Sequence, residues 1–323
     1  MKRTPSVIIL IPNYNSASIM YRNKPILLSC LQSLKKTKYN NYKILIADNS
    51  STDNSREIAK RFNGVKFQVK KTREEYGGIP RTNNFGIRYI MRHYNPDYIL
   101  MYNTDMLVND ALWLKKLVDL AESDEKIGLV GCKLLYPTGK IQHAGIKINY
   151  FPVNMGRGEL DKGQYDKIEE ADGVTAALVL IKNTVIKKVD LFDEKFYNGF
   201  DDTDFCIRVR KAGFKIMYDG KASIIHFEGF ASANSPDPAV RDKSFYGHHV
   251  AYMYFAFKNF QTLDIVRAIF SSLVRSILVY SVDDTKTKKA TIKVRDRALW
   301  RLGVAIKSIF DGYGLYKTQS NRK

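Results

Sequence analysis

The chain has 323 residues, of which 45% are hydrophobic and 26% charged, and this balance is ordinary for a soluble globular protein. No stretch reaches the ~18 to 20 apolar residues that a membrane-spanning helix needs, and the apolar run Val7–Ile11 is too short for a secretory signal. The cysteines Cys30, Cys132 and Cys206 are widely spaced and fit a reducing compartment. We therefore expect a cytoplasmic protein.

The formal net charge of +19 is concentrated near the end of the chain. From Lys258 onward there are 14 Lys/Arg and 5 Asp/Glu, a net charge of +9. Such asymmetry implies an anionic partner, which could be a membrane surface, a nucleic acid or an acidic substrate. The apolar run Ile265–Tyr280, interrupted by Arg267 and Arg275, is typical of an interfacial amphipathic helix or of an ordinary helix packed on the rest of the protein.

The first half of the chain alternates strand-like and helix-like patterns, which favours an α/β fold with a mainly parallel central sheet. Near-continuous apolar strands fit a sheet that is covered on both faces. The predicted strands are residues 7–11, 43–47, 65–69, 98–102 and 127–135, and residues 174–181 and 222–225 form further apolar runs. The predicted helices are residues 27–34, 55–62, 82–94, 114–121 and 202–212.

The pattern changes twice further along the chain. Residues 139–168 are rich in Gly and Tyr and read as loops, and the chain becomes helical, aromatic and basic after Phe245. We therefore predict a catalytic domain over residues 1–244 and a basic helical region over residues 245–323.

Three polar clusters, at residues 12–15, 48–53 and 103–105, directly follow predicted strands. Ligands of open parallel sheets bind at the carboxyl ends of the strands, so these clusters predict one crevice. The alternative is that Asn, Asp and Ser only make turns there. No Gly-x-Gly-x-x-Gly follows the first strand and no Walker loop is present, so phosphate binding would need a metal and scattered side chains.

Carboxylates supply the candidate chemistry. Asp105, at the end of a buried strand, is a plausible ligand for Mg²⁺ or Mn²⁺ that bridges a diphosphate. Three acids lie within four residues, at Asp201, Asp202 and Asp204. Repulsion between their charges raises the pKa of at least one carboxyl group, which suits a general base. The alternative is that one of them caps a helix. His226 follows an apolar run and is either a metal ligand or a packed histidine.

The chain resembles glycosyltransferase family 2, and in particular its rhamnosyltransferase-like branch with a GT-A fold. The resemblance covers about residues 7–229 and rests on six motifs in the family's order. The motifs are Ile8–Asn15, Cys30–Leu34, Asp48–Asp53, Arg81–Ile87, Asn103–Asp105 with Leu135–Gly145, and Phe200–Arg208. The resemblance implies a Rossmann-like nucleotide-binding fold and an inverting, metal-dependent sugar transfer.

The resemblance also implies residue roles. Asp202 is the catalytic base, and Asp105 and His226 are the metal ligands. The donor and nucleotide site comprises Pro12, Tyr14, Asn15, Asp48, Ser50, Arg81, Asn84, Asn103, Thr104 and Asp105. The acceptor side comprises Gln142, His143, Asp172 and Asp201.

Three positions depart from the family pattern. Asn103 replaces the first acid of Asp-x-Asp, which implies a metal held through Asp105, the diphosphate and water. Asp201 replaces the usual Glu, and Ala176 stands where a Gly is usual, which narrows the floor of the acceptor site.

The expected donor is dTDP-rhamnose or a UDP-sugar, and the expected acceptor is a hydroxyl of a glycan or lipid-linked glycan in polysaccharide or cell-envelope biosynthesis. The basic end of the chain fits peripheral attachment to the cytoplasmic face of a membrane. The alternatives are a nucleotidyltransferase and a non-catalytic sugar- or nucleic-acid-binding protein. We expect no nucleic-acid partner, because the acids at 105 and 201–204 would repel phosphate without a cation. A homodimer is left open.

Overall fold

The structure is a computed structural model that describes residues 3–70, 78–196, 199–228, 238–282, 290–294 and 297–320. The chain divides into two compact units. The first unit comprises Met1–Glu194 with Asp201–Asn234, and the second comprises Lys195–Phe200 with Ser235–Lys323. Residue 244, where the sequence suggested a boundary, lies within a helix, and the division into domains at that residue stays a prediction.

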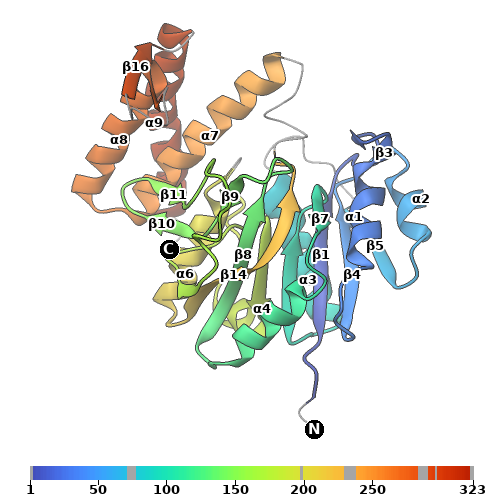
Figure 1. Cartoon of the computed structure of the whole chain (residues 1–323). Helices are drawn as coiled ribbons and strands as arrows, with labels where there is room; N and C mark the ends of the chain where they lie inside the picture. The colour runs from blue at the N-terminus through green and yellow to red at the C-terminus, as the bar shows by residue number, and fades with distance from the viewer. Residues whose placement is uncertain are drawn as a thin grey trace. The chain divides into compact units, whose positions relative to one another are not determined.

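The first unit contains a large sheet with helices between its strands (Figure 1). Its strands are β1 (Val7–Asn13), β2 (Met20–Tyr21), β3 (Lys24–Pro25), β4 (Tyr42–Asp48), β5 (Val65–Val69), β6 (Tyr98–Tyr102), β7 (Met106–Val108), β8 (Ile127–Leu135), β9 (Ile141–His143), β10 (Ile146–Ile148), β11 (Pro152–Asn154), β12 (Ile168–Glu170), β13 (Leu178–Lys182) and β14 (Lys215–His226). Its helices are α1 (Ile26–Leu34), α2 (Ser55–Lys60), α3 (Gly78–His93), α4 (Trp113–Glu122), α5 (Asn183–Lys188) and α6 (Asp201–Lys211).

The main sheet runs in the order β12-β14-β8-β13-β6-β1-β4-β5, with β7 paired to β14 and β9 to β8. Strands β6, β1, β4 and β5 are parallel to one another, as are β8 and β14. Strand β13 runs antiparallel to both β6 and β8. The predicted α/β fold is confirmed, and the sheet is a mixed one in which the parallel half carries the N-terminal polar clusters.

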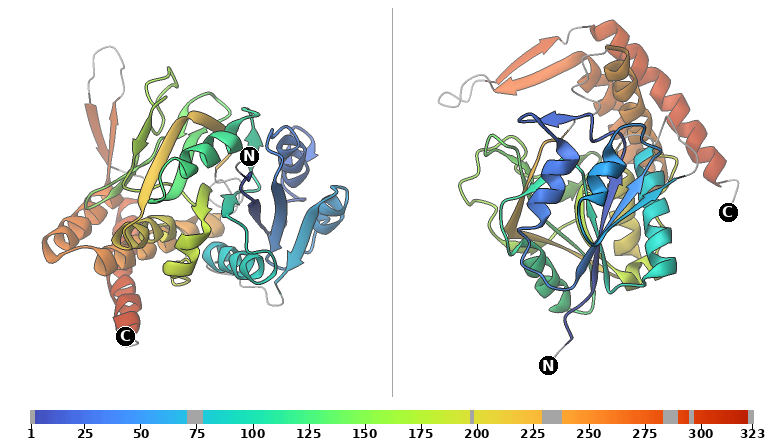
Figure 2. Two further views of the ribbon diagram at one scale, coloured as in Figure 1. Left: turned by 90° about the horizontal axis from the view of Figure 1, so that it is seen from below. Right: turned by 90° about the vertical axis from the view of Figure 1, so that its right-hand side faces the viewer.

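Alternating side chains of β1 enter two separate cores, as the two-residue period of a strand requires. Val7, Ile9 and Ile11 pack with apolar residues of α1, α2 and α4. Ile8 and Leu10 pack with residues of α3, α5 and α6 on the opposite face. Figure 2 shows these helical layers on either side of the sheet in the view from below. Burial on both faces explains why the central strands are almost entirely apolar.

The apolar run of residues 174–181 forms a strand only from Leu178 onward. Strand β13 starts at Leu178, and the Leu178 amide closes a turn onto the Thr175 carbonyl at 3.3 Å. The apolar run continues through Val174 because that side chain is buried against Gly131 of β8 without pairing in the sheet. Residues 174–177 are therefore a loop, and they contribute to the pocket described below.

The second unit contains three helices and a hairpin within its described residues. These are α7 (Pro238–Asn259), α8 (Thr262–Ile277), α9 (Ala298–Ser320), β15 (Leu278–Val282) and β16 (Ala290–Val294). The helical character predicted after Phe245 is present, but Leu278 to Tyr280 belong to the hairpin and not to a helix. Among the helices that the structure describes, none has the length and apolar character needed to span a bilayer.

A segment between β11 and β12 is anchored on the main sheet by charge and by close backbone packing. Lys133 of β8 is buried, and its Nζ lies 2.8 Å from Asp161 Oδ2 and also pairs with Asp166. Gly220 of β14 donates its N–H to the Lys167 carbonyl at 2.9 Å. A Cβ atom at Gly220 would lie 1.8 Å from the Tyr165 carbonyl oxygen, so only glycine allows this approach.

We predict that Gly220→Ala lowers the free energy of unfolding by about 2 kcal/mol, because the added methyl group has to displace backbone atoms. Chemical denaturation followed by circular dichroism measures the change. Gly303→Ala in α9 is the control, since its Cβ would meet no atom within 4 Å and should be neutral or slightly stabilising. Unchanged stability of Gly220→Ala would contradict the close approach.

Candidate functional site

The carboxyl ends of the parallel strands β1 and β4 are joined by their last residues. Asn13 is paired with Asp48 in the register of the two strands, and its Nδ2 donates to Asp48 Oδ1 at 2.6 Å. The Asp48 carboxylate also accepts from Ser51 Oγ at 2.5 Å and from the Ser51 N–H at 2.8 Å. Pro12 lies opposite Ala47 in the same register. The two polar clusters that were expected to share an edge therefore do so.

The loops beyond these strands are tied to each other. The Asn15 N–H donates to Ser51 Oγ at 2.9 Å, and Asn15 Oδ1 accepts from the Thr52 N–H at 2.8 Å. Asn15 and Ser50 both have left-handed backbones, with φ of 48° and 57°. Tyr14 is 38% exposed at this edge, so its ring is accessible. The arrangement holds the predicted nucleotide loops in one place, and their contacts with a nucleotide stay a prediction.

Asp105 and His226 meet because the short strand β7 pairs with the end of β14. His226 lies opposite Met106 in that pairing, and the Phe227 N–H donates to the Asp105 carbonyl at 3.0 Å. His226 Nε2 lies 3.1 Å from Asp105 Oδ1, and His226 Nδ1 lies 2.6 Å from Gln142 Oε1. The imidazole is buried and held at both nitrogens.

The residues just before Asp105 are also fixed at this edge. The Asn103 N–H donates to the Ala177 carbonyl at 3.0 Å, and Thr104 Oγ1 lies 3.3 Å from Ser16 Oγ. The third polar cluster is thereby linked to the first, through Ser16, and to the loop of residues 174–177.

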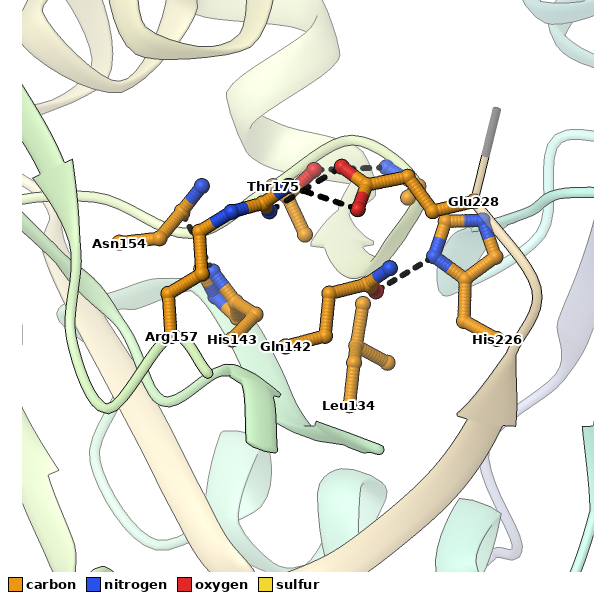
Figure 3. A pocket seen from close by; sticks show the side chains of 9 residues that line it. Leu134, Gln142, His143, Asn154, Arg157, Thr175, His226 and Glu228 are labelled. Atoms are coloured by element: carbon orange, nitrogen blue, oxygen red, sulfur yellow. Dashed lines mark hydrogen bonds and ion pairs between the residues drawn. The ribbon is translucent and has the colours of Figure 1, made fainter. Parts of the chain in front are cut away.

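A small pocket, partly open to solvent, lies beside His226 (Figure 3). In Figure 3, His226 is directed at Gln142, and Arg157 at Glu228. The pocket is lined by Leu134, Gln142, His143, Asn154, Arg157, Thr175, Ala177, His226 and Glu228. The structure therefore brings three predicted residues, Gln142, His143 and His226, to one cavity.

His143 is the second histidine of the pocket. Its Nδ1 lies 2.8 Å from Asn154 Oδ1, and its Nε2 is buried with no hydrogen-bond partner among the described residues. Burial lowers the pKa of His143 to about 4, which keeps the ring neutral near neutral pH.

Asp202 lies at the first turn of α6, next to the loop that lines the pocket. Its Oδ2 accepts from the Ala176 N–H at 3.2 Å, and its Oδ1 accepts from the Thr203 N–H at 2.7 Å. Ala176 stands between the pocket residues Thr175 and Ala177. The negative charge of Asp202 also acts on His143, where it opposes the effect of burial on the pKa. Asp202 is therefore bonded to the loop whose residues Thr175 and Ala177 line the same pocket as His226.

The neighbouring acids have different environments. Burial, and then the charge of Asp202, raise the pKa of Asp201 to about 8, so this carboxyl is largely protonated at neutral pH. Asp204 is fully buried and pairs with Arg208 Nε at 2.9 Å. Asp202 is left as the acid of this group that forms no ion pair among the described residues.

Other predicted site residues make contacts within the fold. Asn84 of α3 is buried and bonds both the N–H and the carbonyl of Phe192, while Arg81 Nε lies 3.9 Å from Glu194. Asp172 accepts from the Ile148 N–H at 3.0 Å and from Arg210 at 3.2 Å. None of the three lines the pocket, and their predicted contacts with donor or acceptor stay predictions.

Sequence reasoning missed four residues around the pocket. Arg157 bonds both oxygens of Glu228, at 3.1 and 2.8 Å, and Tyr136 Oη donates to Glu228 Oε2 at 2.6 Å. Asn154 holds His143. The position of Glu228, two residues after the candidate ligand His226, could have identified it as a site residue. Asn154 and Arg157 lie in a segment whose sequence indicates only a loop.

No group of three or more His, Cys, Asp or Glu side chains within the described ranges is arranged to hold a metal ion. Asp105 and His226 form a pair of converging oxygen and nitrogen atoms. A divalent ion there would have to complete its shell with ligand oxygens or water, which is how Mg²⁺ is commonly bound.

Several known proteins have sequences similar to this chain. The chain is 26% identical over 263 residues to the O-antigen biosynthesis protein RfbC of Myxococcus xanthus, covering 78% of this chain and 19% of that protein. It is 22% identical over 201 residues to the rhamnosyltransferase WbbL of Escherichia coli K12, covering 58% of this chain and 73% of that protein. The chain spans between about a fifth and about a third of the length of the first curated relatives it matches.

A solved structure supports the fold. The mannosyltransferase PcManGT of Pyrobaculum calidifontis, in complex with GDP-Man and Mn²⁺, matches 99% of this chain and 81% of its own chain, with a TM-score of 0.55 and 12% identity. The predicted GT-A fold is thereby confirmed. The sequence model of "Glycosyl transferase family 2" matches residues 8–176, slightly more than half of the chain. The chain belongs to glycosyl transferase family 2.

Proposed function

We propose that this protein is an inverting glycosyltransferase that moves a sugar from a nucleotide diphosphate to an acceptor hydroxyl. The observation that carries the proposal is a pocket lined by His226, whose Nε2 lies 3.1 Å from Asp105, and by Thr175 and Ala177, which flank the Ala176 N–H that Asp202 accepts. Asp105 and His226 would supply ligands for a cation beside a diphosphate, and Asp202 would supply a base for an alcohol. Family membership supports the same reaction class.

The polar edge of β1 and β4 is the proposed site of the nucleotide. Asp48 and Asn15 are fixed by Ser51 and the backbone around it, so a nucleotide would meet a preformed loop. Preformed polar groups lower the entropy cost of binding. Tyr14 is the exposed aromatic side chain at this edge, where it could pack against the nucleotide.

Asp105 and His226 fit a divalent cation, Mn²⁺ or Mg²⁺. Asp105 Oδ1 and His226 Nε2 converge at 3.1 Å while the other ring nitrogen is occupied by Gln142, as is usual for a metal-binding histidine. A bound ion would neutralise the negative charge that develops on the departing diphosphate. Asn103, in place of an acid, leaves fewer protein oxygens for the ion, so the donor itself would complete the shell.

Asp202 is the proposed general base. Its Oδ1 and Oδ2 accept backbone N–H groups, which hold the carboxylate in place beside the pocket. In a single displacement the acceptor oxygen forms a bond to the anomeric carbon, the bond from that carbon to the diphosphate oxygen breaks, and Asp202 takes the hydroxyl proton. Attack opposite the leaving group inverts the anomeric centre.

The donor and acceptor classes follow from the relatives. The rhamnosyltransferase WbbL and the O-antigen protein RfbC support dTDP-rhamnose or a UDP-sugar as the donor and a glycan or lipid-linked glycan as the acceptor. A nucleotidyltransferase is the competing enzyme. Release of nucleoside diphosphate from a panel of nucleotide sugars supports glycosyl transfer, whereas release of pyrophosphate from nucleoside triphosphates supports the competitor.

The second unit is the proposed attachment to an anionic membrane surface. Leu263, Val266 and Phe270 of α8 are 62%, 56% and 67% exposed, and their spacing places them on one side of the helix. Leu299 and Phe310 of α9 are 86% and 71% exposed. Exposed apolar side chains on helices with a net positive charge are typical of interfacial binding, and α8 and α9 each carry more Lys/Arg than Asp/Glu. Such attachment would hold the protein at the cytoplasmic face of a membrane near a lipid-linked acceptor.

We predict that Asp202→Asn lowers kcat by 10²–10⁴-fold, the range for loss of a general base, while the Kd for the nucleotide donor changes little. Turnover and donor binding are measured separately. Asp201→Asn is the matched control, because a protonated Asp201 already presents a neutral side chain, and its turnover should fall far less. Near-normal turnover of Asp202→Asn would remove Asp202 from the role of base.

We predict that Asp105→Ala weakens Mn²⁺-dependent donor binding by at least tenfold, because one of the two protein ligands is lost. Titration of a nucleoside diphosphate with and without Mn²⁺ measures this effect. Binding in the absence of metal should be nearly the same in both proteins. Equal Mn²⁺ enhancement in wild type and variant would place the metal elsewhere.

We predict that the protein floats with phosphatidylglycerol vesicles but not with phosphatidylcholine vesicles, and that salt weakens the association. Phe270→Ser combined with Phe310→Ser should abolish flotation. Leu160→Ser is the control, since Leu160 is 55% exposed in the first unit. If the wild-type protein does not float with anionic vesicles, the helices of the second unit do not bind an anionic membrane surface.

A further inference from the structure

Phe200 has a backbone conformation that its side chain disfavours. Its φ is 66°, and the preceding residue, Gly199, has a φ of 88°. Glycine adopts this left-handed region freely, whereas a residue with a Cβ atom adopts it about 5–30-fold less readily. The chain therefore has glycine at one of two consecutive left-handed positions and a bulky ring at the other. Strained residues of this kind gather at functional sites.

Aromatic side chains of α7 hold the Phe200 ring. Its centroid lies 4.9 Å from the ring of His248, 5.3 Å from that of Tyr252 and 5.6 Å from that of Phe255. Phe200 is 8% exposed, and all four residues belong to the second unit. Tilted rings at these centroid distances attract one another beyond the effect of burial. Packing of the ring therefore offsets the cost of the left-handed backbone.

The next residue in the chain begins the helix that carries the proposed base. Phe200 is the last residue of its segment of the second unit, and Asp201 is the first residue of α6 in the first unit. The backbone angles at Phe200 therefore set the direction in which the chain enters α6. Asp202 follows at once, and its Oδ2 accepts the Ala176 N–H at 3.2 Å. A change of φ at residue 200 would shift the first turn of α6 relative to that N–H.

We propose that Phe200 is a positioning residue for Asp202, and that the aromatic rings of α7 contribute to sugar transfer by keeping Phe200 in its left-handed conformation. The proposal rests on the proposed function in one respect, the role of Asp202 as the base. When the rings no longer hold residue 200, its φ returns to the negative range that residues with a Cβ atom prefer. The Asp202 carboxylate then leaves the Ala176 N–H, and fewer molecules have the base in place.

Two substitutions at residue 200 separate the ring from the backbone conformation. Phe200→Ala and Phe200→Gly both remove the ring, but only glycine keeps a positive φ without strain. We expect kcat to be about 5–30-fold lower in Phe200→Ala than in Phe200→Gly, with an unchanged Kd for UDP or dTDP in both. Release of UDP from UDP-glucose or of dTDP from dTDP-rhamnose measures turnover. Thermal unfolding checks that each variant is folded at the assay temperature.

Two substitutions in α7 test the contribution of the second unit. Tyr252→Ala removes a ring that contacts Phe200, whereas Phe257→Ala removes a ring of the same helix that contacts Tyr313 instead, at 5.3 Å. We expect Tyr252→Ala to lower kcat, and Phe257→Ala, the matched control, to leave it unchanged. In protein that already carries Phe200→Gly, Tyr252→Ala should have no further effect, because glycine needs no ring to hold its φ positive.

A second readout needs no turnover. The Ala176 N–H donates to Asp202, so the hydrogen-exchange rate of this amide in ¹⁵N-alanine-labelled protein reports whether the carboxylate is in place. We expect faster exchange in Phe200→Ala and Tyr252→Ala than in the wild type. Exchange in Phe200→Gly and Phe257→Ala should match the wild type.

Three results would overturn the proposal. These are equal turnover of Phe200→Ala and Phe200→Gly, equal effects of Tyr252→Ala and Phe257→Ala, and the same Ala176 exchange rate in every variant. Normal turnover of Asp202→Asn together with the expected exchange rates overturns the base of the proposed function and leaves the positioning role of Phe200 standing.

Discussion

The candidate site depends on the contact of Asp105 Oδ1 with His226 Nε2 at 3.1 Å. Strand β7 is only three residues long, yet its pairing with the end of β14 sets this distance, because it aligns Met106 with His226. The rest of the first unit supports that alignment. Strand β14 is held by β8 over most of its length, and β8 in turn carries β9, which presents Gln142.

The same framework separates two kinds of carboxylate. Asp105 lies on the sheet edge with a polar partner, whereas Asp201, Asp202 and Asp204 begin one helix. Burial neutralises Asp201, and Arg208 balances Asp204. Asp202 keeps two backbone donors. A helix start with three acids therefore ends with one acid suited to accept a proton, and the others are used to hold the helix.

Much of the fold could be predicted from the sequence because its central strands are apolar on both faces. Val7–Ile11 and Tyr98–Tyr102 read as strands for that reason, and the polar residues after them marked the shared edge. The candidate site could be predicted only in part. Gln142, His143 and His226 were named, but Arg157 and Glu228 meet across 71 positions, and no local pattern links them.

The remaining errors also have physical causes. The apolar run that contains β13 begins at Val174, before the strand itself. Val174 is buried because it contacts Gly131, although it forms no strand pairing in the sheet. Apolar character therefore did not locate the first residue of the strand. Strands β9 to β12 have three residues each, too few to show a two-residue period. The hairpin of β15 and β16 follows a helical run without a break in apolar character.

The anchoring of residues 155–166 has a consequence for how this scaffold could diversify. Lys133 holds Asp161 and Asp166, Gly220 admits the backbone at Tyr165, and backbone hydrogen bonds join Met155, Gly158, Glu159 and Asp161 to residues 139–145. Arg157 lies within this segment and lines the pocket. Substitutions at the side chains of the segment that make none of these contacts would therefore change the wall of the cavity while its attachments to the sheet remain.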